Sequence, residues 1–331
     1  MFGSWERDCS VSNQNMNDAD KNWLTDHFGS QVAFSEPMSR HTSFGIGGPA
    51  DALLHVRTDQ QLRDLVRWAK DRGLPFMILG AGSNLLVRDG GIRGLVLKLA
   101  NGFESIERGS ELLPNGWVGI IAGAGVLVRK LGKYALDHGL GGLNFALGIP
   151  GTVGGALRMN AGAWGSSMAD TTKSVSFLNQ HGDIVTMGKD RLRFSYRRLN
   201  LEKGSIILRG EFVLERSDRE GLRQEALHMQ RKRRSTQPLS LPSAGSIFRN
   251  PSADVSAGEL IDRAGLKGLR KGGAEVSPKH ANFIVNQGDA RASDVVALMR
   301  QVQDIVFDRF AVQLEPEVMI IGQEADSQEL L

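Results

Sequence analysis

The glycine-rich stretch at residues 148–165, GIPGTVGGALRMNAGAWG, constrains the fold of this chain more than any other segment. Glycine adopts positive φ angles without strain and lets another group approach its backbone closely. A flexible linker is a poor interpretation, because the stiff or apolar residues Ile149, Pro150 and Val153 interrupt the glycines. Two interpretations therefore stay open: a backbone cradle for a phosphate group, or a tight turn that is buried for packing.

A second glycine-rich turn lies within the segment LGAGSNLLV and contains Gly80, Gly82, Ser83 and Asn84. Such a turn can direct several backbone N–H groups at an anion, and the Ser and Asn side chains can supplement them. The turn does not complete the dinucleotide-binding pattern G-x-G-x-x-G, because Leu85 stands where the third glycine belongs. The sequence also contains no G-x-x-x-x-G-K-[ST] phosphate loop.

Hydrophobic spacing predicts a chain with both helices and strands. Leu62, Leu65 and Ala69 lie on one face of a predicted helix, which has Thr58 as its N-cap and Gly73 as its end. The same reasoning predicts further helices near residues 127–139, 217–238, 256–264 and 293–309. Apolar runs predict strands at PFMI, LLV, GIRGLVLKL, GWVGIIAGAG, SVSFLN, DIVTM, SIILRGEFVLE, ANFIVN and LEPEVMIIG.

At 331 residues the chain is too long for one ordinary core, so several domains are expected. The charged, helix-prone segment that begins near residue 217 marks a domain boundary. Residues 1–20 are polar and lack the apolar core of a signal peptide, and we interpret them as a disordered leader. The predicted domain segments are 21–105, 106–216 and 217–322, followed by a polar tail at 323–331.

Charge and cysteine content exclude several functions. Lys and Arg total 40 against 37 Asp and Glu, and this small positive excess predicts no nucleic-acid partner. The single cysteine, Cys9, excludes intramolecular disulfides and cysteine metal clusters and suits a reducing, cytoplasmic location. No apolar run approaches the roughly 18 residues of a membrane span, so we expect a soluble protein with no membrane partner. Histidine spacing predicts no catalytic metal, and the sequence is compatible with a monomer.

Seven segments, in order along the chain, resemble one family: the FAD-dependent UDP-N-acetylenolpyruvoylglucosamine reductases (MurB) of peptidoglycan synthesis. They are HTSFGIGGPAD, LGAGSNLLV, GIPGTVGGALRMNAGAWG, FSYR, SAGSIFRNP, VSPKHANFIVN and LEPEVMIIG, and they extend over residues 38–322. The resemblance implies an α+β fold. Residues 21–105 and 106–216 would form the two-subdomain FAD-binding fold of the vanillyl-alcohol-oxidase (PCMH) type, and residues 217–322 a substrate-binding domain.

The resemblance also implies which residues hold FAD, without a covalent bond. Along the pyrophosphate it implies Gly80, Ala81, Gly82, Ser83 and Asn84. Along the ribityl chain and the isoalloxazine ring it implies Gly148, Ile149, Gly151, Gly154, Asn160, Ala161 and Gly162. The glycines would let the backbone lie against the flat cofactor, where any Cβ atom would collide.

The implied reaction converts UDP-N-acetylglucosamine enolpyruvate to UDP-N-acetylmuramate. Hydride from flavin N5 adds to the terminal carbon of the enolpyruvyl group, so negative charge develops on the neighbouring carbon and on the carboxylate. Such a site needs a cation, a proton donor and a group that assists the donor. The resemblance assigns these roles to Arg197, Ser246 and Glu317, and a positioned general acid is typically worth about 10²–10⁴ in rate.

Each assignment has a plain structural alternative. Ser246 could be an ordinary turn serine, Arg197 a surface ion pair and Glu317 an edge-strand charge. Arg198 and Glu315 are neighbours that compete for the roles of the arginine and the glutamate. The interval from the arginine to the serine resembles the type II enzymes, because it lacks the extra loop by which type I enzymes contribute a substrate-binding tyrosine.

Four further residues are implied in substrate binding: Tyr196, Asn250, Lys279 and His280. Asn250 could hydrogen-bond the substrate and Lys279 could meet its diphosphate, but a turn asparagine and a solvated Lys–His pair explain them equally well. NADPH is implied as the co-substrate that reduces the flavin and leaves. The sugar nucleotide would then occupy the same face of the flavin.

Two other functions compete with this one. The first is a flavin oxidase or dehydrogenase of the same fold with another substrate, which is disfavoured because no histidine lies in or beside the GAGSN segment. The second is a catalytically silent flavoprotein or nucleotide-binding regulator. Joint retention of the serine, the arginine and the glutamate disfavours it, because a silent descendant has no reason to keep all three.

Overall fold

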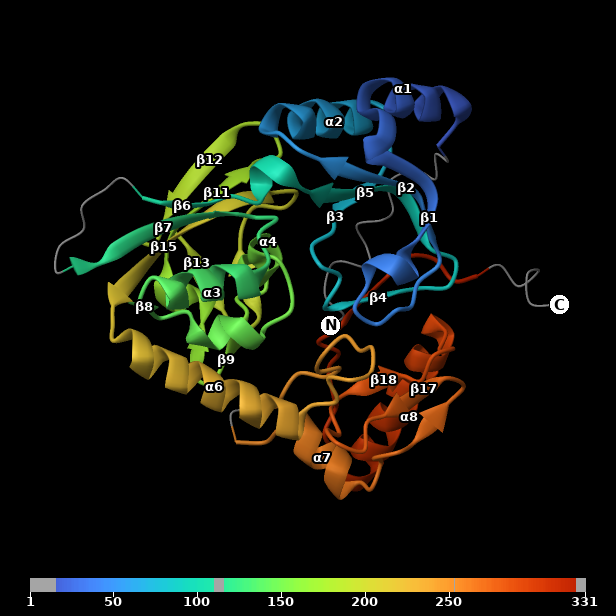
Figure 1. Ribbon diagram of the computed structural model, residues 1–331. Helices are drawn as coiled ribbons and strands as arrows, with labels where there is room; N and C mark the ends of the chain where they lie inside the picture. Colours follow the sequence, from blue (N-terminus) through green and yellow to red (C-terminus); the bar gives the residue numbers. More distant parts are fainter. Residues whose placement is uncertain (1–15, 110–115, 253, 326–331) are drawn as a thin grey trace. The chain divides into compact units, whose positions relative to one another are not determined.

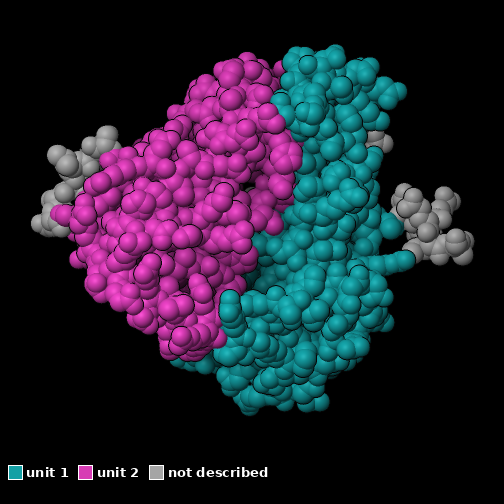
Figure 2. Space-filling view, viewed as in Figure 1, with its two compact units in different colours: residues 1–53, 82–96, 234–331 teal, residues 54–81, 97–233 magenta. Residues whose placement is uncertain are grey.

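The computed structural model describes residues 16–109, 116–252 and 254–325. Contacts divide the chain into two compact units, drawn in different colours in Figure 2. Unit 1 combines residues 1–53, 82–96 and 234–331, and unit 2 combines residues 54–81 and 97–233. Segments of the two units therefore alternate along the sequence. Each unit is held together by contacts between residues that lie far apart in the chain. The division into three consecutive domain segments is a different partition and stays a prediction.

Helices occur where the hydrophobic spacing predicts them. Helix α2, Asp59–Asp71, begins after Thr58, whose hydroxyl accepts a hydrogen bond from the Gln61 N–H at 3.1 Å, and Gly73 follows its end with a φ of 64°. The predicted cap and end are thus confirmed. The other helices are α1 Asp18–Phe28, α3 Val128–Asp137, α4 Val153–Arg158, α5 Met168–Thr171, α6 Arg219–Thr236, α7 Ala257–Arg263 and α8 Ala292–Phe310. Among the described residues, no helix is both long enough and apolar enough to cross a membrane.

The predicted strands are also present, mixed with shorter ones (Figure 1). In the first half of the chain they are β1 Val32–Pro37, β2 Pro49–Val56, β3 Phe76–Ile78, β4 Leu85–Val87, β5 Ile92–Leu99, β6 Ile106–Arg108, β7 Val118–Gly123, β8 Leu140–Gly141, β9 Gly162–Ala163 and β10 Ser166–Ser167. The later strands are β11 Thr172–Leu178, β12 Ile184–Gly188, β13 Arg193–Ser195, β14 Arg198–Asn200, β15 Ile206–Arg216, β16 Arg270–Lys271, β17 Ala274–Val276, β18 Ile284–Asn286 and β19 Met319–Ile321. One four-stranded sheet has the order β1-β2-β5-β3.

Unit 2 is built on a sheet with the strand order β12-β11-β15-β7-β6. The long strand β15 pairs antiparallel with both β11 and β7, so it forms the centre of this sheet. Helix α4 packs against β15 and β7, where Val153 and Leu157 are fully buried. The core of the unit also includes Phe177 and Phe212. The sheet thereby supports the segment that carries the glycine-rich stretch.

Unit 1 joins the two ends of the chain. Its core places Phe44 and Leu86 with residues of α7, α8 and β17. The strands β16, β17 and β18 form an antiparallel sheet, and β19 pairs in parallel with β4. The Asp89 carboxylate accepts hydrogen bonds from the N–H groups of Ala292 and Ser293 at 2.8 and 3.0 Å, which caps the N-terminus of α8.

The predicted leader and tail are both too long. Helix α1 begins at Asp18, because Asn17 and Asp20 form a capping box with reciprocal hydrogen bonds of 2.9 and 3.0 Å. At the other end, Gln323 forms a β-bridge with Gly91, so the tail does not begin at residue 323. Residues 1–15 of the leader and 326–331 of the tail lie outside the described residues.

Candidate active site

The first glycine turn connects β3 to β4 and owes its central glycine to packing. Gly82 has a φ of 62°, and a Cβ atom there would lie 2.1 Å from the carbonyl oxygen of His41 and 2.8 Å from Cα of Thr42. The Gly82 carbonyl also accepts a hydrogen bond from the Ser43 N–H at 3.0 Å. Only glycine fits a left-handed position with so close a neighbour. The turn is therefore held in place by residues 41–43.

Asn84 links this turn to the segment that contains Glu317 and leads into β19. Its side-chain amide donates to the Glu317 carbonyl at 3.2 Å, and its own carbonyl accepts from the Met319 N–H at 3.0 Å. The strand register continues the link, since Met319 pairs with Leu85 in the parallel β19–β4 ladder. The side chain of Asn84, predicted to bind FAD, thus also fixes the backbone of the predicted glutamate.

Ser246 and Glu317 lie on adjacent backbone segments of unit 1. The Glu317 N–H donates to the Ile247 carbonyl at 2.7 Å, and Ser246 forms a β-bridge with Phe283. Both Ser246 and Glu317 are half-buried. The competing Glu315 has a 73 % exposed side chain whose carboxylate lies 3.8 Å from a nitrogen of the Arg249 guanidinium, as expected of a surface ion pair. This geometry favours Glu317 over Glu315.

Arg197 belongs to unit 2, where it lies against the second glycine stretch. Its guanidinium donates to the Gly162 carbonyl at 3.4 Å and stands over the Tyr196 ring, 5.2 Å from the centroid. Asn160, predicted to bind FAD, has a structural role here. Its amide nitrogen donates to the Ser195 carbonyl at 3.0 Å, and its oxygen accepts from the Ala169 N–H at 3.1 Å.

Three residues without the freedom of glycine adopt positive φ in this part of unit 2: Asn160 at 41°, Trp164 at 59° and Arg197 at 55°. Such strained backbone tends to cluster at functional sites. Trp164 is 44 % exposed, and the Lys232 ammonium lies 5.2 Å from its ring centroid. Sequence reasoning did not single out Trp164. The available signal was an aromatic residue inside a glycine-rich stretch.

Most glycines of the two stretches are explained by close protein neighbours. A Cβ atom would collide at Gly80 with Thr152 Oγ1, at Gly148 with the Arg233 guanidinium, at Gly154 with Ala124 and at Gly162 with the Ser166 carbonyl, at distances of 2.6–2.9 Å. The packing interpretation therefore accounts for Gly80, Gly154 and Gly162. It does not account for Gly148, because the end of the flexible Arg233 side chain can move aside. Gly155 differs, because the nearest atom to its Cβ would be Thr152 Oγ1 at 3.7 Å, and the open surface there fits the approach of a flat ligand. Gly151 has a φ of 136°, which also favours glycine.

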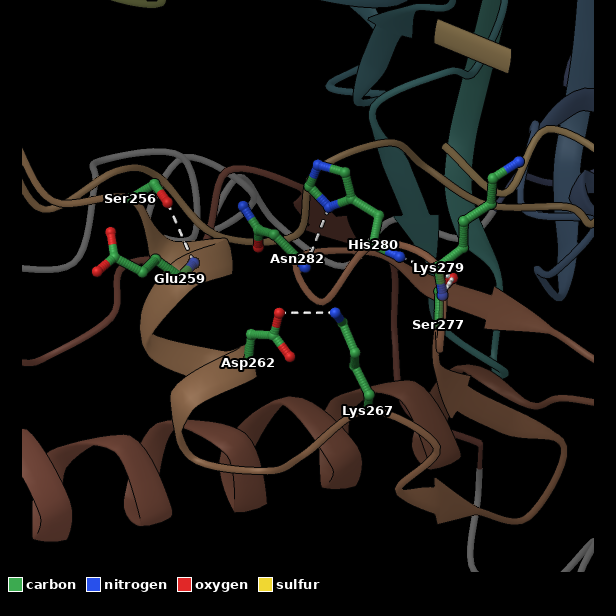
Figure 3. A network of polar contacts seen from close by, with 8 residues as sticks. All are labelled: Ser256, Glu259, Asp262, Lys267, Ser277, Lys279, His280 and Asn282. Carbon is green, nitrogen blue, oxygen red and sulfur yellow. Dashed lines mark hydrogen bonds and ion pairs between the residues drawn. The ribbon is translucent and has the colours of Figure 1, made fainter. Parts of the chain in front are cut away.

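Of the remaining predicted substrate residues, Lys279 and His280 are drawn in Figure 3. The Asn250 side-chain oxygen accepts from the Ala257 N–H at 3.2 Å, which supports the turn interpretation of this asparagine. The Lys279 ammonium donates to the Arg234 carbonyl. The Ser277 hydroxyl accepts from the N–H groups of Lys279 and His280 at 3.2 and 3.3 Å, which fixes the turn that presents both side chains.

The surroundings of His280 favour the neutral form of its ring. Burial lowers its pKa from the ordinary value and the Lys267 ammonium lowers it further, while a backbone hydrogen bond acts in the opposite direction. Its Nδ1 accepts from the Asn282 N–H at 3.3 Å, and its ring packs on Phe283 with centroids 4.7 Å apart. A protonated ring could not accept this hydrogen bond.

We expect this histidine to make unfolding easier at acid pH. Below about pH 6.5 the unfolded chain takes up a proton that folded His280 resists, so proton uptake favours the unfolded state. The free energy of unfolding of the wild type should therefore fall, relative to that of His280→Gln, as the pH decreases from 7.5 to 5.5. Denaturant titrations of both proteins measure the difference, and parallel pH curves would contradict the expectation.

A cavity of about 410 Å³ lies between α3 and α6 and involves no predicted site residue. It is lined by Arg129, Lys130, Lys133, Leu136, Leu147 and Gln230. Within the described ranges, no group of three or more His, Cys, Asp or Glu side chains is arranged to hold a metal ion. Within unit 1 the structure brings Ser246 and Glu317 close together, and within unit 2 it brings Arg197 against the second glycine stretch.

Comparison with known proteins defines the class first. Residues 50–188 match the FAD binding domain family, and residues 237–321 match the family described as UDP-N-acetylenolpyruvoylglucosamine reductase, C-terminal domain. The protein is therefore a flavoprotein, with an FAD-binding domain followed by the C-terminal domain of this family. Its predicted fold class and cofactor are confirmed.

The relatives identify the family. The UDP-N-acetylenolpyruvoylglucosamine reductase of Desulfosudis oleivorans is 46 % identical over 92 % of this chain and 98 % of its own, and that of Clostridioides difficile is 40 % identical over 88 % and 94 %. The crystal structure of the Thermus caldophilus enzyme (MurB) superposes with a TM-score of 0.73 at 37 % identity, covering 87 % of this chain and 97 % of that one. The chain belongs to the UDP-N-acetylenolpyruvoylglucosamine reductase family and is an FAD-dependent oxidoreductase.

Proposed function

We propose that this protein reduces UDP-N-acetylglucosamine enolpyruvate to UDP-N-acetylmuramate, with NADPH as the reductant and bound FAD as the carrier. The names of the relatives support the substrate class. The observation that carries the proposal is the 2.7 Å hydrogen bond from the Glu317 N–H to the Ile247 carbonyl, which fixes the glutamate beside the backbone of Ser246. A cytoplasmic location is part of the proposal, because Cys9 is the single cysteine.

The turn 80–84 and the stretch 148–162 would hold FAD. When bound, FAD supplies the hydride that reaches the terminal carbon of the enolpyruvyl group. Ser246 donates a proton to the neighbouring carbon, which is strongly basic once the enolate has formed. Glu317 orients the serine hydroxyl. Tyr196, Asn250, Lys279 and His280 remain proposed substrate ligands.

The Arg197 guanidinium binds the substrate carboxylate and its developing charge. A planar guanidinium matches a carboxylate in a bidentate manner, which an ammonium cannot do. Contact with the Gly162 carbonyl and the Tyr196 ring orients this guanidinium. Its strained backbone, with a φ of 55°, supports a functional role for this position.

The decisive experiment is anaerobic and uses the FAD-loaded protein. NADPH first reduces the bound flavin, and UDP-N-acetylglucosamine enolpyruvate is then added. We expect the absorbance of oxidised flavin to return with one equivalent of substrate. Failure to reoxidise would contradict the proposal. Rapid reoxidation by oxygen, with none by the substrate, would instead indicate a flavin oxidase.

Replacing Arg197 by lysine should weaken substrate turnover. Losing a charged bidentate contact costs about 1.5–3 kcal/mol, so we expect kcat/KM for the enolpyruvyl substrate to fall by about 10- to 100-fold. Steady-state kinetics measures the loss. Arg198→Lys is the matched control, because Arg198 is exposed and its guanidinium lies 3.4 Å from the Asn200 side chain. Equal losses in both variants would reject the assignment to Arg197.

A further inference from the structure

Asn282 is a buried asparagine that completes the main-chain hydrogen bonds of one residue. It is 5 % exposed. Its side-chain oxygen accepts from the Phe248 N–H at 3.0 Å, and its side-chain nitrogen donates to the Phe248 carbonyl at 2.8 Å. One primary amide therefore replaces the two partners that a neighbouring strand would supply. Removing it would leave two buried main-chain groups unsatisfied.

The backbone of Asn282 makes a further hydrogen bond to the segment that contains Ser246. Its carbonyl accepts from the Ile247 N–H at 2.9 Å, and the next residue, Phe283, forms the β-bridge with Ser246. In the next peptide group, the Ile247 carbonyl accepts from the Glu317 N–H. The segment 246–248 is thus held by Asn282 on one side and by Glu317 on the other.

The position of Asn282 is itself fixed from several directions. Its N–H donates to His280 Nδ1 at 3.3 Å (Figure 3). The carbonyl of the next residue, Phe283, accepts from the Ser277 N–H at 2.8 Å. Helix α7 packs closely, since a Cβ atom at Gly258 would lie 3.5 Å from Cβ of Asn282. These contacts restrict the side chain, so its amide is pre-organised to hold Phe248.

We propose that Asn282 is a positioning residue that sets the location of the Ser246 hydroxyl for proton transfer. This inference rests on the proposed role of Ser246 as proton donor. Asn282 acts through the backbone of residues 246–248 and touches neither substrate nor flavin. Proton transfer is sensitive to such placement, because a displacement of about 1 Å can cost about 100-fold in rate.

The test compares Asn282→Ala with a matched control, Asn286→Ala, in the FAD-loaded full chain. Asn286 ends strand β18, which begins just after Asn282 and Phe283, and it is also 5 % exposed. Its side-chain nitrogen donates to the Phe44 carbonyl at 3.1 Å, and its side-chain oxygen accepts from the N–H groups of Gly288 and Ala290 at 2.8 and 3.1 Å. Among the described residues, this side chain makes no hydrogen bond to segment 246–248. Both variants therefore lose a buried asparagine, but only Asn282→Ala loses the two side-chain hydrogen bonds to Phe248.

We expect Asn282→Ala to slow reoxidation of the reduced flavin by substrate about tenfold or more, with flavin reduction by NADPH and KM nearly unchanged. Hydrogen–deuterium exchange should quicken at the amides of Ile247 and Phe248. Asn286→Ala should lower the melting temperature without either effect. Equal slowing in both variants, or unchanged reoxidation in Asn282→Ala, would overturn the inference.

Two further comparisons keep the test decisive. If Asn282→Ala does not fold, Asn282→Asp replaces it, because it keeps an acceptor for the Phe248 N–H and sets a charged carboxylate oxygen against the Phe248 carbonyl in place of the donor. The same slowing relative to Asn286→Ala is expected, and its absence overturns the inference. Ser246→Ala separates the two levels of the argument. Slow reoxidation in that variant with unchanged reoxidation in Asn282→Ala rejects only the positioning role, whereas unchanged reoxidation in Ser246→Ala rejects both.

Discussion

Ser246→Ala should still be reduced by NADPH but should lose at least about 100-fold in the rate at which substrate reoxidises its flavin. Alanine keeps the backbone bridge to Phe283 and removes only the hydroxyl, so the change isolates proton donation from structure. Reduction by NADPH needs no proton from this serine. The two half-reactions should therefore separate in the variant.

Stopped-flow absorbance of the flavin measures both half-reactions in one preparation. Ser256→Ala is a suitable control, because Ser256 caps α7 by accepting from the Glu259 N–H at 3.1 Å and loses only a cap worth about 1 kcal/mol (Figure 3). That control should lower stability and leave both half-reactions intact. If Ser246→Ala slows both half-reactions alike, the serine is structural.

Gly82→Ala should produce a protein that retains little flavin. A left-handed backbone costs alanine about 1–2 kcal/mol, and the new Cβ atom would also lie 2.1 Å from the His41 carbonyl oxygen. The turn 80–84 must move to relieve this collision, and flavin binding must then restore it. We expect the Kd for FAD to rise about 30-fold or more, which corresponds to about 2 kcal/mol.

The ratio of flavin absorbance to protein absorbance and a fluorescence titration of the apoprotein with FAD both measure this loss. Gly268→Ala is the matched control: its φ is 81°, but among the described residues no atom beyond its chain neighbours lies within 4 Å of the new Cβ. It should lose stability through backbone strain and keep its flavin. Normal FAD binding by Gly82→Ala would show that the turn does not hold the cofactor.

Local signals in the sequence predicted most helices and strands. Apolar spacing and the Thr58 cap locate α2, and the same reasoning locates α8 within a residue of each end. The capping box of Asn17 and Asp20 is also a local signal, although the polar composition of residues 1–20 favours a disordered leader. Local sequence does not show which strands pair with one another. Strands β3 and β4 flank one turn yet join different sheets, because their partners lie far along the chain.

The candidate site was predictable mainly through motif resemblance. Local sequence left Ser246 and Glu317 with plain structural alternatives, and only folding brings their backbones together. Glycine content alone does not show why a glycine is needed. A position where a Cβ atom would collide with Thr152, such as Gly80, looks the same in the sequence as a position that a cofactor approaches. Asn282 gave no signal, because a buried amide that satisfies a distant backbone resembles any strand asparagine.

The alternation of the units has a consequence for biosynthesis. The core of unit 1 contains Phe44, Leu86 and Val318, so it cannot form completely until the ribosome has synthesised residue 318. Strand β4 likewise lacks its partner until β19 has been synthesised, and an unpaired strand edge can pair with other nascent chains. Translation that stops before residue 319 therefore leaves an aggregation-prone product, even though every residue of unit 2 has already been synthesised.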